Sequence, residues 1–485
     1  MELALQNTAV KKVKRVKKHS RNVISREWQL IALTCLIIPL SAFVSPIISL
    51  IIVYITGLYL LFKKSNYKFL VFFICFIFIQ NITLIVFADK FTTLTNGLFS
   101  LGKEIMLYLF VLKNFFSKKV KRLDKRLFII TIAFVVLVTG SFVLSSASFY
   151  AKTISIRQLF LPFVCLYFGF FVKLTKRQKK RLFDLIIYFG IVVAILGLLE
   201  FFFIKDALWI KLPIAKYQAN KGAEFDLYRG VPLNFYTWDF KGFFGVVVRR
   251  LVSIFGDPLI TGHYLFMCFA LVSLSSFKSK KLLKFLFLIT AILTFSKGVL
   301  VCLLVFIIAN YLARIKNYKR FKKTIFILLV FSLIAFPVAV VLLNNIFPNS
   351  SIIIHLNGFI NGLLNSSILG EGIGKAGVMV SVKTNIERLT GESYIGVLSS
   401  QIGLVGLALY LAFMVLVLFI LFRFFIIRHQ RFIFVSVVLL ASVVLESFFS
   451  ESSVGIIATG LYFVFVGMNL RTMRIKKVKK RYGQK

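Results

Sequence analysis

Cysteine, histidine and acidic residues are scarce in this sequence, and their scarcity excludes several kinds of site. The chain has five cysteines, four histidines and 17 acidic residues among 485 residues. The cysteines are isolated within apolar stretches without CxxC or ligand spacing, which indicates free thiols packed in a core. The polar segments contain no Asp-x-Asp pair and no histidine cluster. We therefore expect no divalent metal and no cofactor.

Positive charge, by contrast, is abundant: the 61 lysines and arginines give a formal net charge of +44. In a soluble protein such a charge would suggest a nucleic-acid partner. Here the basic residues flank apolar stretches, where anionic lipid headgroups attract each of them by about 1 kcal/mol. The charge therefore predicts anionic membrane lipids as partners and argues against nucleic acid.

Long apolar stretches determine the fold class. Hydrophobic residues make up 59% of the chain, and the mean hydropathy is +0.90. Apolar stretches recur from Trp28 to Leu470, and about 20 such residues cross roughly 30 Å of hydrocarbon. No long polar linker divides them. We expect an all-α polytopic membrane protein with one transmembrane domain at 28–470, between basic tails at 1–27 and 471–485.

The distribution of basic residues predicts the topology, because cytoplasmic loops retain lysine and arginine during insertion. Clusters of basic residues lie two spans apart and hold about 45 of the 61. They predict about 14 transmembrane helices with both termini cytoplasmic. The N-terminal polar stretch is too long and too charged for a secretory signal peptide, so the first apolar stretch is kept as a span. The clusters are Lys11–Arg26, Lys63–Lys68, Lys113–Arg126, Lys173–Arg181, Lys278–Lys284, Arg314–Lys323, Arg423–Arg431 and Arg471–Lys485.

Two apolar stretches, Trp28–Phe62 and Leu282–Ala313, are long for one helix and short for two. Turn residues lie near their midpoints, Ser45-Pro46 in the first and Ser296-Lys297-Gly298 in the second. Basic residues flank both ends of each stretch, which requires an even number of crossings. We therefore predict two short helices in each.

The same topology places two long segments outside the membrane, 205–257 and 344–393, and we expect short helices within them. Aromatic residues in the first segment lie among lysines and glycines, a mixture that could stack on sugar rings. The alternative is an interfacial aromatic belt. The candidates for sugar stacking are Trp209, Tyr236 and Trp238.

Charged residues also occur inside the predicted spans, where each costs about 2.5–3.5 kcal/mol at mid-bilayer. Arg157, Glu200 and Lys297 lie near external span ends, so they could line a cavity open to that side. Snorkelling or structural ion pairing is the alternative interpretation. The other charged residues within spans are Lys103, Glu104 and Glu446.

Three polar clusters come out on the same external side in this topology. The first runs from Arg249-Arg250 to Gly256-Asp257-Pro258, and the second is Thr294-Phe-Ser-Lys297-Gly298. The third runs from Arg388 through Glu392 to Gln401-Ile-Gly403-Leu-Val-Gly406. One external polar site is therefore the leading hypothesis.

Two shorter motifs have structural interpretations. Asp257-Pro258 has the pattern of a helix N-cap followed by a first-turn proline. Gly370-Glu-Gly-Ile-Gly374 could be mistaken for a phosphate-binding loop, but it follows no predicted strand and lacks the Walker lysine pattern. We expect an external turn there, in which bare backbone could approach a ligand closely.

The three clusters resemble the O-antigen polymerase and ligase superfamily, whose members transfer glycans from a lipid diphosphate carrier. The resemblance covers roughly Arg249–Leu409. Arg250 with Gly256-Asp257-Pro258 is similar to an Arg…Asn-Pro element, with Asp for Asn. Thr294–Gly298 is similar to Thr-x-Ser-Arg-Gly, with Lys297 for Arg, and Gly403-Leu-Val-Gly406 is similar to Gly-Leu-x-Gly. Ligases carry His-Asn where this chain has Glu392-Ser393, which favours the polysaccharide polymerases of Gram-positive capsule or exopolysaccharide systems.

The resemblance implies a GT-C-like enzyme of the bacterial cytoplasmic membrane that joins undecaprenyl-diphosphate-linked repeat units on the outer face. A flippase and a chain-length regulator of the same pathway would be its protein partners. Negative charge builds on the diphosphate leaving group, and cationic side chains stabilise it. The candidates for diphosphate contact are Arg157, Arg249, Arg250, Lys297 and Arg388.

An acceptor hydroxyl needs a proton acceptor, and Glu392 is the candidate general base. It follows Arg388 by four residues, so a helical ion pair between the two is the alternative. His263 and His355 are the other candidate bases. Two other functions stay open: a ligase that moves finished glycan to another acceptor, and a flippase of lipid-linked oligosaccharide, which would show related halves and a charged central cavity. The sequence has no convincing internal repeat.

Overall fold

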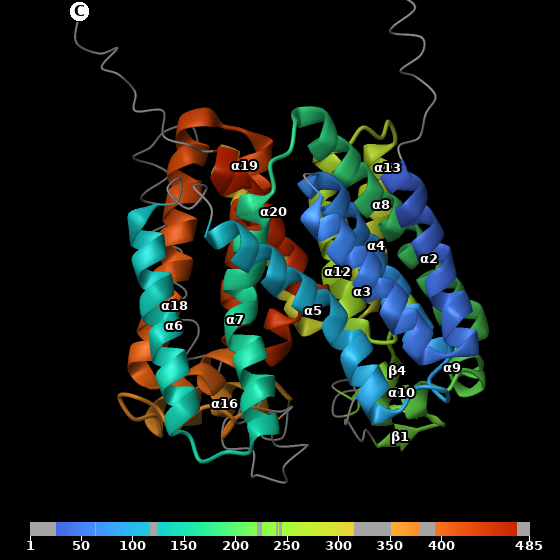
Figure 1. Ribbon diagram of the computed structural model, residues 1–485, viewed down its shortest axis with the longest axis horizontal. Coiled ribbons are helices and arrows are strands. Elements are labelled where there is room, and N and C mark those ends of the chain that lie inside the picture. The colour runs from blue at the N-terminus through green and yellow to red at the C-terminus, as the bar shows by residue number, and fades with distance from the viewer. Residues whose placement is uncertain are drawn as a thin grey trace, which may run out of the picture.

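The computed structural model describes residues 26–63, 65–116, 124–220, 226–238, 241, 245–314, 351–377, 380 and 393–472 (Figure 1). Helices form almost all regular structure in these ranges, and seven of them are long and apolar enough to cross a membrane. They confirm the predicted all-α fold, and their length and composition support a multi-pass membrane protein. The seven are α2 (Arg26–Val44), α4 (Asn66–Val86), α6 (Lys125–Leu144), α7 (Phe149–Phe171), α8 (Lys176–Leu199, which the π-helix η2 continues over Glu200–Ile204), α14 (Lys297–Arg314) and α18 (Tyr394–Arg428).

Other described helices pack against these seven. Those in the bundle are α3 (Pro46–Phe62), α5 (Thr93–Phe115), α12 (Pro258–Leu271), α13 (Lys280–Leu293), α19 (Arg431–Glu446) and α20 (Leu461–Thr472). The short helices α9 (Asp206–Lys211), α10 (Ile214–Asn220) and α16 (Ser351–Leu364) lie at one end of the bundle, at the bottom of Figure 1.

Both predicted helix hairpins are confirmed. Ser45 alone separates α2 from α3, and its hydroxyl accepts a hydrogen bond from the Ile47 amide at 3.3 Å while Pro46 occupies the first helical position. The second hairpin turns at Thr294–Ser296, between α13 and α14. In each case the turn residues end one helix and begin the next within a few positions.

The core is dominated by phenylalanine, and α4 and α7 contribute most to it. The rings of Phe69 and Phe110 stack with centroids 5.2 Å apart, and Phe168 meets both edge-on. Apolar side chains cover all sides of α4, so it is an interior helix rather than an amphipathic one.

Helices α7 and α20 approach each other unusually closely through two glycines. A Cβ added at Gly169 would collide with the backbone of Val464, and one added at Gly467 with the backbone of Leu166. Small residues permit such backbone contact between membrane helices, where van der Waals packing takes the place of a hydrophobic driving force. The residues of α20 from Leu461 to Leu470 are buried.

The described part of the segment 205–257 is folded, as α9 and α10 show, but it also contains strands that the sequence does not predict. β1 (Leu227–Tyr228) pairs antiparallel with β2 (Val231–Pro232), and β3 (Tyr236–Thr237) pairs with β4 (Val248–Arg249). These elements lie at the same end of the bundle as α16 (Figure 1). The strands are two residues long, too short for a period-two pattern to reveal them.

Candidate functional site

The first and second polar clusters meet at the end of the bundle that carries the short strands. The Arg250 guanidinium donates from Nε to the carbonyl oxygen of Thr294 at 2.8 Å and from Nη1 to that of Asn234 at 3.3 Å. The Leu251 amide donates to the Leu293 carbonyl at 2.9 Å. Arg250 is buried, so this side chain links the loop before α12 to the turn between α13 and α14.

The second cluster adjoins the beginning of the third through the C-terminal end of α19. Gly298 packs directly against the Glu446 carboxylate. The next residue, Ser447, accepts a hydrogen bond at 3.0 Å from the amide of Ile395, in the first turn of α18. The described parts of all three clusters therefore meet at one end of the bundle, whereas Arg388 and Glu392 lie outside the described residues.

Arg249, next to Arg250, belongs to an internal ion cluster. Its Nε lies 2.8 Å from Asp206 Oδ1, and its Nη2 contacts Glu200 Oε1. The Tyr236 hydroxyl donates to the other oxygen of Asp206. Partial burial, followed by this bond to Asp206, raises the pKa of Tyr236 to about 12, so the hydroxyl stays a donor at physiological pH. Two carboxylates of the protein thus compensate the Arg249 charge.

Glu200 is the centre of this cluster and is almost completely buried. It accepts from the Trp209 indole at 2.8 Å and from the backbone amides of Val252 and Ser253 at 3.3 and 3.4 Å. The π-helical turn η2 that starts at Glu200 and the 3-10 turn η4 (Ser253–Phe255) bring these donors together. Asp206 and Trp209 follow on α9.

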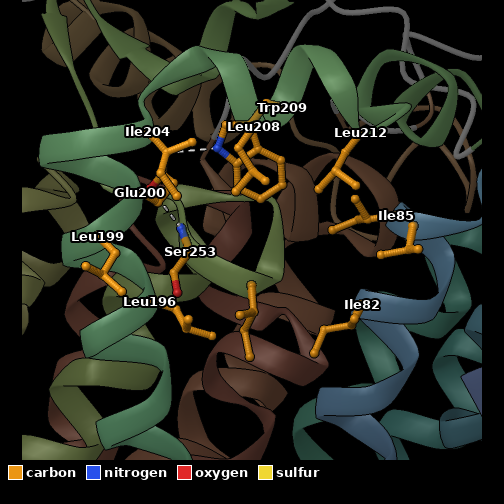
Figure 2. Close-up of a pocket in the computed structure, with 12 residues that line it drawn as sticks. Ile82, Ile85, Leu196, Leu199, Glu200, Ile204, Leu208, Trp209, Leu212 and Ser253 are labelled. Carbon is orange, nitrogen blue, oxygen red and sulfur yellow. Dashed lines mark hydrogen bonds between the residues drawn. The ribbon is translucent and has the colours of Figure 1, made fainter.

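An apolar cavity of about 280 Å³ lies beside Glu200, between α4, α8 and α9 (Figure 2). Trp209 and Glu200 are on one side of it, and Ile82 and Ile85 of α4 face them. Among the described residues that line it, only Glu200 and Ser253 are polar. The Glu200 carboxylate already accepts hydrogen bonds from Trp209 and from the amides of Val252 and Ser253.

Two of the charged residues near span ends, Arg157 and Glu200, form ion pairs, as the structural alternative predicts. Arg157 Nε lies 2.8 Å from Glu104 Oε2, and the Arg157 side chain stays 44% exposed while Glu104 is buried. Lys297 is half-buried in the first turn of α14. Arg157 and Lys297 thus stay candidates for diphosphate contact, on different helices.

The aromatic candidates differ in exposure. Trp209 and Tyr236 are only 3% and 6% exposed, which leaves little ring surface for a sugar. Trp238 is partly exposed; it meets Tyr228 edge-on at 5.2 Å and has the Lys241 ammonium 5.1 Å from its ring centre. Of the three, Trp238 is the one whose position suits sugar stacking.

Helix α18 is broken at Gly403, and the Gly370 turn fills the break. Gly403 has φ +70° and ψ −175°, so the backbone there is not helical. The amides of Glu371 and Gly372 donate to the carbonyls of Ser400 and Gln401 at 2.8 and 3.2 Å. The Leu404 and Val405 amides, freed on the other side of the break, donate at 3.2 Å to the carbonyls of residues 367 and 368. The glycine motif is thus a turn, as predicted, and it satisfies backbone groups that the break exposes.

Two further predictions concern α12. Asp257 caps the helix as predicted, because its Oδ1 accepts from the Leu259 and Ile260 amides at 2.8 and 3.1 Å, and Pro258 follows at the first helical position. His263 is completely buried with its Nε2 2.8 Å from Glu446 Oε1, which removes it from the external surface where a general base would act.

Sequence reasoning missed Asp206 and the role of Glu446. Glu200 and Glu446 were recognisable as charges that are energetically unfavourable within membrane spans. The residues that contact their carboxylates, however, come from distant positions in the sequence. Asp206 gave no signal, since an acidic residue in a polar segment is unremarkable in sequence. Comparison of the sequence with known protein families and with curated proteins gives no match.

The contact between Gly298 and Glu446 leads to a prediction. Replacing Gly298 with alanine should push the Glu446 carboxylate away and destabilise the protein by about 1–3 kcal/mol, because the added methyl group overlaps a buried side chain. Thermal denaturation in detergent, followed by size-exclusion chromatography, measures this loss. Gly140→Ala on α6, where no atom lies within 4 Å of the added Cβ, is the control. Adding Glu446→Asp, which shortens the neighbouring side chain, should partly restore the stability of the Gly298→Ala variant. A thermal denaturation midpoint equal to that of the wild type for Gly298→Ala alone would contradict the prediction.

Proposed function

We propose that this protein is a polysaccharide polymerase, which joins undecaprenyl-diphosphate-linked oligosaccharide repeat units on the outer face of the bacterial cytoplasmic membrane. The observation that carries the proposal is that the three polar clusters adjoin at one end of a membrane-spanning bundle. The buried Arg250 contacts the turn before α14, and Gly298 and the first turn of α18 both contact the end of α19. Residues from the loop before α12, the start of α14 and the start of α18 approach one another there. These are the segments on which the resemblance to the polymerase and ligase superfamily rests.

The proposal includes the predicted topology of about 14 spans with both termini in the cytoplasm. Successive described helices from α2 to α14, and again from α18 to α20, are joined mostly by short connections, which supports repeated crossing. The apolar sequence at 324–343 lies outside the described residues and would supply one more span. The strands and α16 would then face outward, and the connections rich in lysine and arginine would face the cytoplasm.

The proposed chemistry is transfer of a growing glycan from its lipid diphosphate to a hydroxyl of one lipid-linked repeat unit. The bond between sugar C1 and the diphosphate oxygen breaks as the acceptor oxygen bonds to C1, and the acceptor proton passes to a base. Arg250 and Lys297 would stabilise the charge that develops on the diphosphate. Glu392 stays the proposed base, with Arg388 beside it in the same sequence segment.

Complementation of a gene deletion tests the proposal. The deletion strain should accumulate single repeat units on the lipid carrier, exposed on the outer face and never elongated. Wild-type protein should restore long chains, and Arg250→Ala or Lys297→Ala should lower the polymerisation rate by roughly 100–1,000-fold. Lys211→Ala is the matched control: it removes an exposed cation from the same external segment and should restore wild-type chains.

The same experiment separates the alternatives, provided that blotting shows equal amounts of each variant in the membrane. Long lipid-linked chains that are never transferred would indicate a ligase. Repeat units retained on the cytoplasmic side would indicate a flippase. Either result, or full activity of both Arg250→Ala and Lys297→Ala, would contradict the proposed polymerase and its site.

A further inference from the structure

His263, Cys302 and Glu446 form a buried cluster of metal-ligating side chains below the polar end of the bundle. They come from α12, α14 and α19, and each is at most 1% exposed. Their ligand atoms all lie within 4.8 Å of one another. Glu446 Oε1 is 2.8 Å from His263 Nε2, and Glu446 Oε2 is 3.9 Å from Cys302 Sγ. The carboxylate is therefore placed between an imidazole and a thiol.

Polar atoms around this cluster lack hydrogen bonds, although they are buried. Neither ring nitrogen of His263 makes a hydrogen bond of acceptable geometry, even though Nε2 is close to the carboxylate. Buried polar groups in native proteins are nearly always satisfied, so such a group of unsatisfied atoms indicates a missing ligand.

The electrostatics lead to the same conclusion. A buried carboxylate needs a compensating positive charge. A cation bound between the three side chains would compensate Glu446 and use a lone pair of His263 at the same time. Gly298 leaves room for the carboxylate, and the Tyr462 hydroxyl holds the His263 carbonyl at 2.5 Å.

We propose that His263, Cys302 and Glu446 bind one zinc ion, which ties α12, α14 and α19 together. Imidazole nitrogen, thiolate sulfur and carboxylate oxygen suit zinc, whereas magnesium and calcium prefer oxygen ligands alone. The donors of a tetrahedral zinc site lie about 3.3–3.6 Å apart. The separations of 2.8 and 3.9 Å from the two Glu446 oxygens lie within about 0.5 Å of this range, so small side-chain shifts would bring the donors to it. On binding, the Cys302 thiol gives up its proton to water and the thiolate ligates the metal.

This site adjoins the second polar cluster through Gly298, but it uses none of the proposed diphosphate contacts and does not depend on the proposed function. The sequence predicts no metal, because these three ligands are not closely spaced along it. Cys302 and Glu446 are 144 positions apart, and only the packing of α14 against α19 joins them.

Metal analysis of the purified full-length protein tests the inference. The protein is isolated in detergent through a tag without histidine, and zinc is measured by mass spectrometry. We expect about one zinc per chain in the wild type and a loss of at least about fivefold in His263→Ala and Cys302→Ser. Cys268→Ser is the matched control, because this cysteine is equally buried on α12 but faces the Ile186 carbonyl. It should keep its zinc.

A second measurement keeps the test decisive if a variant folds poorly. Chelator-treated wild-type protein, reconstituted with cobalt(II), should show thiolate-to-metal charge-transfer absorption, and added zinc should abolish it. Cys268→Ser should show the same band. Wild-type protein that contains no zinc and takes up neither metal would overturn the proposal. So would equal zinc in the wild type and a folded Cys302→Ser variant.

Discussion

Replacing Gly403 with alanine should destabilise the folded protein by at least about 3 kcal/mol and remove most of the monodisperse protein from a detergent extract. The backbone at Gly403 lies in a region that essentially only glycine adopts. An alanine Cβ would also collide with the backbone of residues 368–370, which cannot rotate away as a flexible side chain could. If those residues moved, the hydrogen bonds across the break in α18 would be lost with them.

The measurement is the temperature at which half of the detergent-solubilised protein leaves the monodisperse peak. Gly97→Ala on α5 is the control, since no atom lies within 4 Å of its added Cβ. This control should be neutral or slightly stabilising, because alanine favours a helix over glycine by about 0.5–1 kcal/mol. Equal midpoints for Gly403→Ala and Gly97→Ala would show that the break in α18 is not required for the stability of the folded protein.

Replacing Glu200 with alanine should lower the free energy of unfolding by about 3–5 kcal/mol, the loss typical of removing one partner from a buried ion pair. Glu200 accepts hydrogen bonds from Arg249, from the Trp209 indole and from two backbone amides. All four donors lose this acceptor in the variant, although Arg249 keeps Asp206. The loop 250–257 should therefore loosen where the first polar cluster begins.

Thermal denaturation checks this prediction, together with the fluorescence of Trp209 in a background where Trp28 and Trp238 are phenylalanine. Glu200→Gln, which keeps the shape but not the charge, should fall between the wild type and Glu200→Ala. Glu27→Ala is the control, because its pair with Lys68 is partly exposed and such pairs contribute at most about 1 kcal/mol. If Glu27→Ala and Glu200→Ala lowered the thermal denaturation midpoint equally, burial of the Glu200 cluster would not contribute to stability.

The helical architecture could be predicted because hydropathy and basic residues report directly on it. The turn at Ser45-Pro46 was visible, and the turn at Thr294–Ser296 was visible to within about two residues, since turn residues lie near the midpoint of each apolar stretch. The break in α18 was not, because Gly403 sits in an apolar sequence that reads as one helix. Only the packing of the Gly370 turn against that sequence makes a break favourable.

The candidate site was predictable as a set of segments but not as a set of contacts. The sequence places the clusters of Arg250, Lys297 and Gly403 on one side, and the structure brings their described parts together at one end of the bundle. The sequence does not reveal that Asp206 and Glu200 compensate the charge of Arg249. This pairing depends on the π-helical turn at the end of α8. Charge in sequence identifies candidates, and only the fold determines which of them already have partners.

Helix α20 can pack into the bundle only late in biosynthesis. It is an interior helix, yet its contacts with α7 join residues about 300 positions apart, as Arg471 and the Phe170 carbonyl do. At about 5–20 residues per second, the ribosome needs roughly 15–60 s to make the intervening chain. During that time lipid tails or water must occupy the groove on α7 where Gly169 later meets α20. The bundle is therefore closed from within by one of its last helices, and a chain that ends before α20 would keep a hole at its centre.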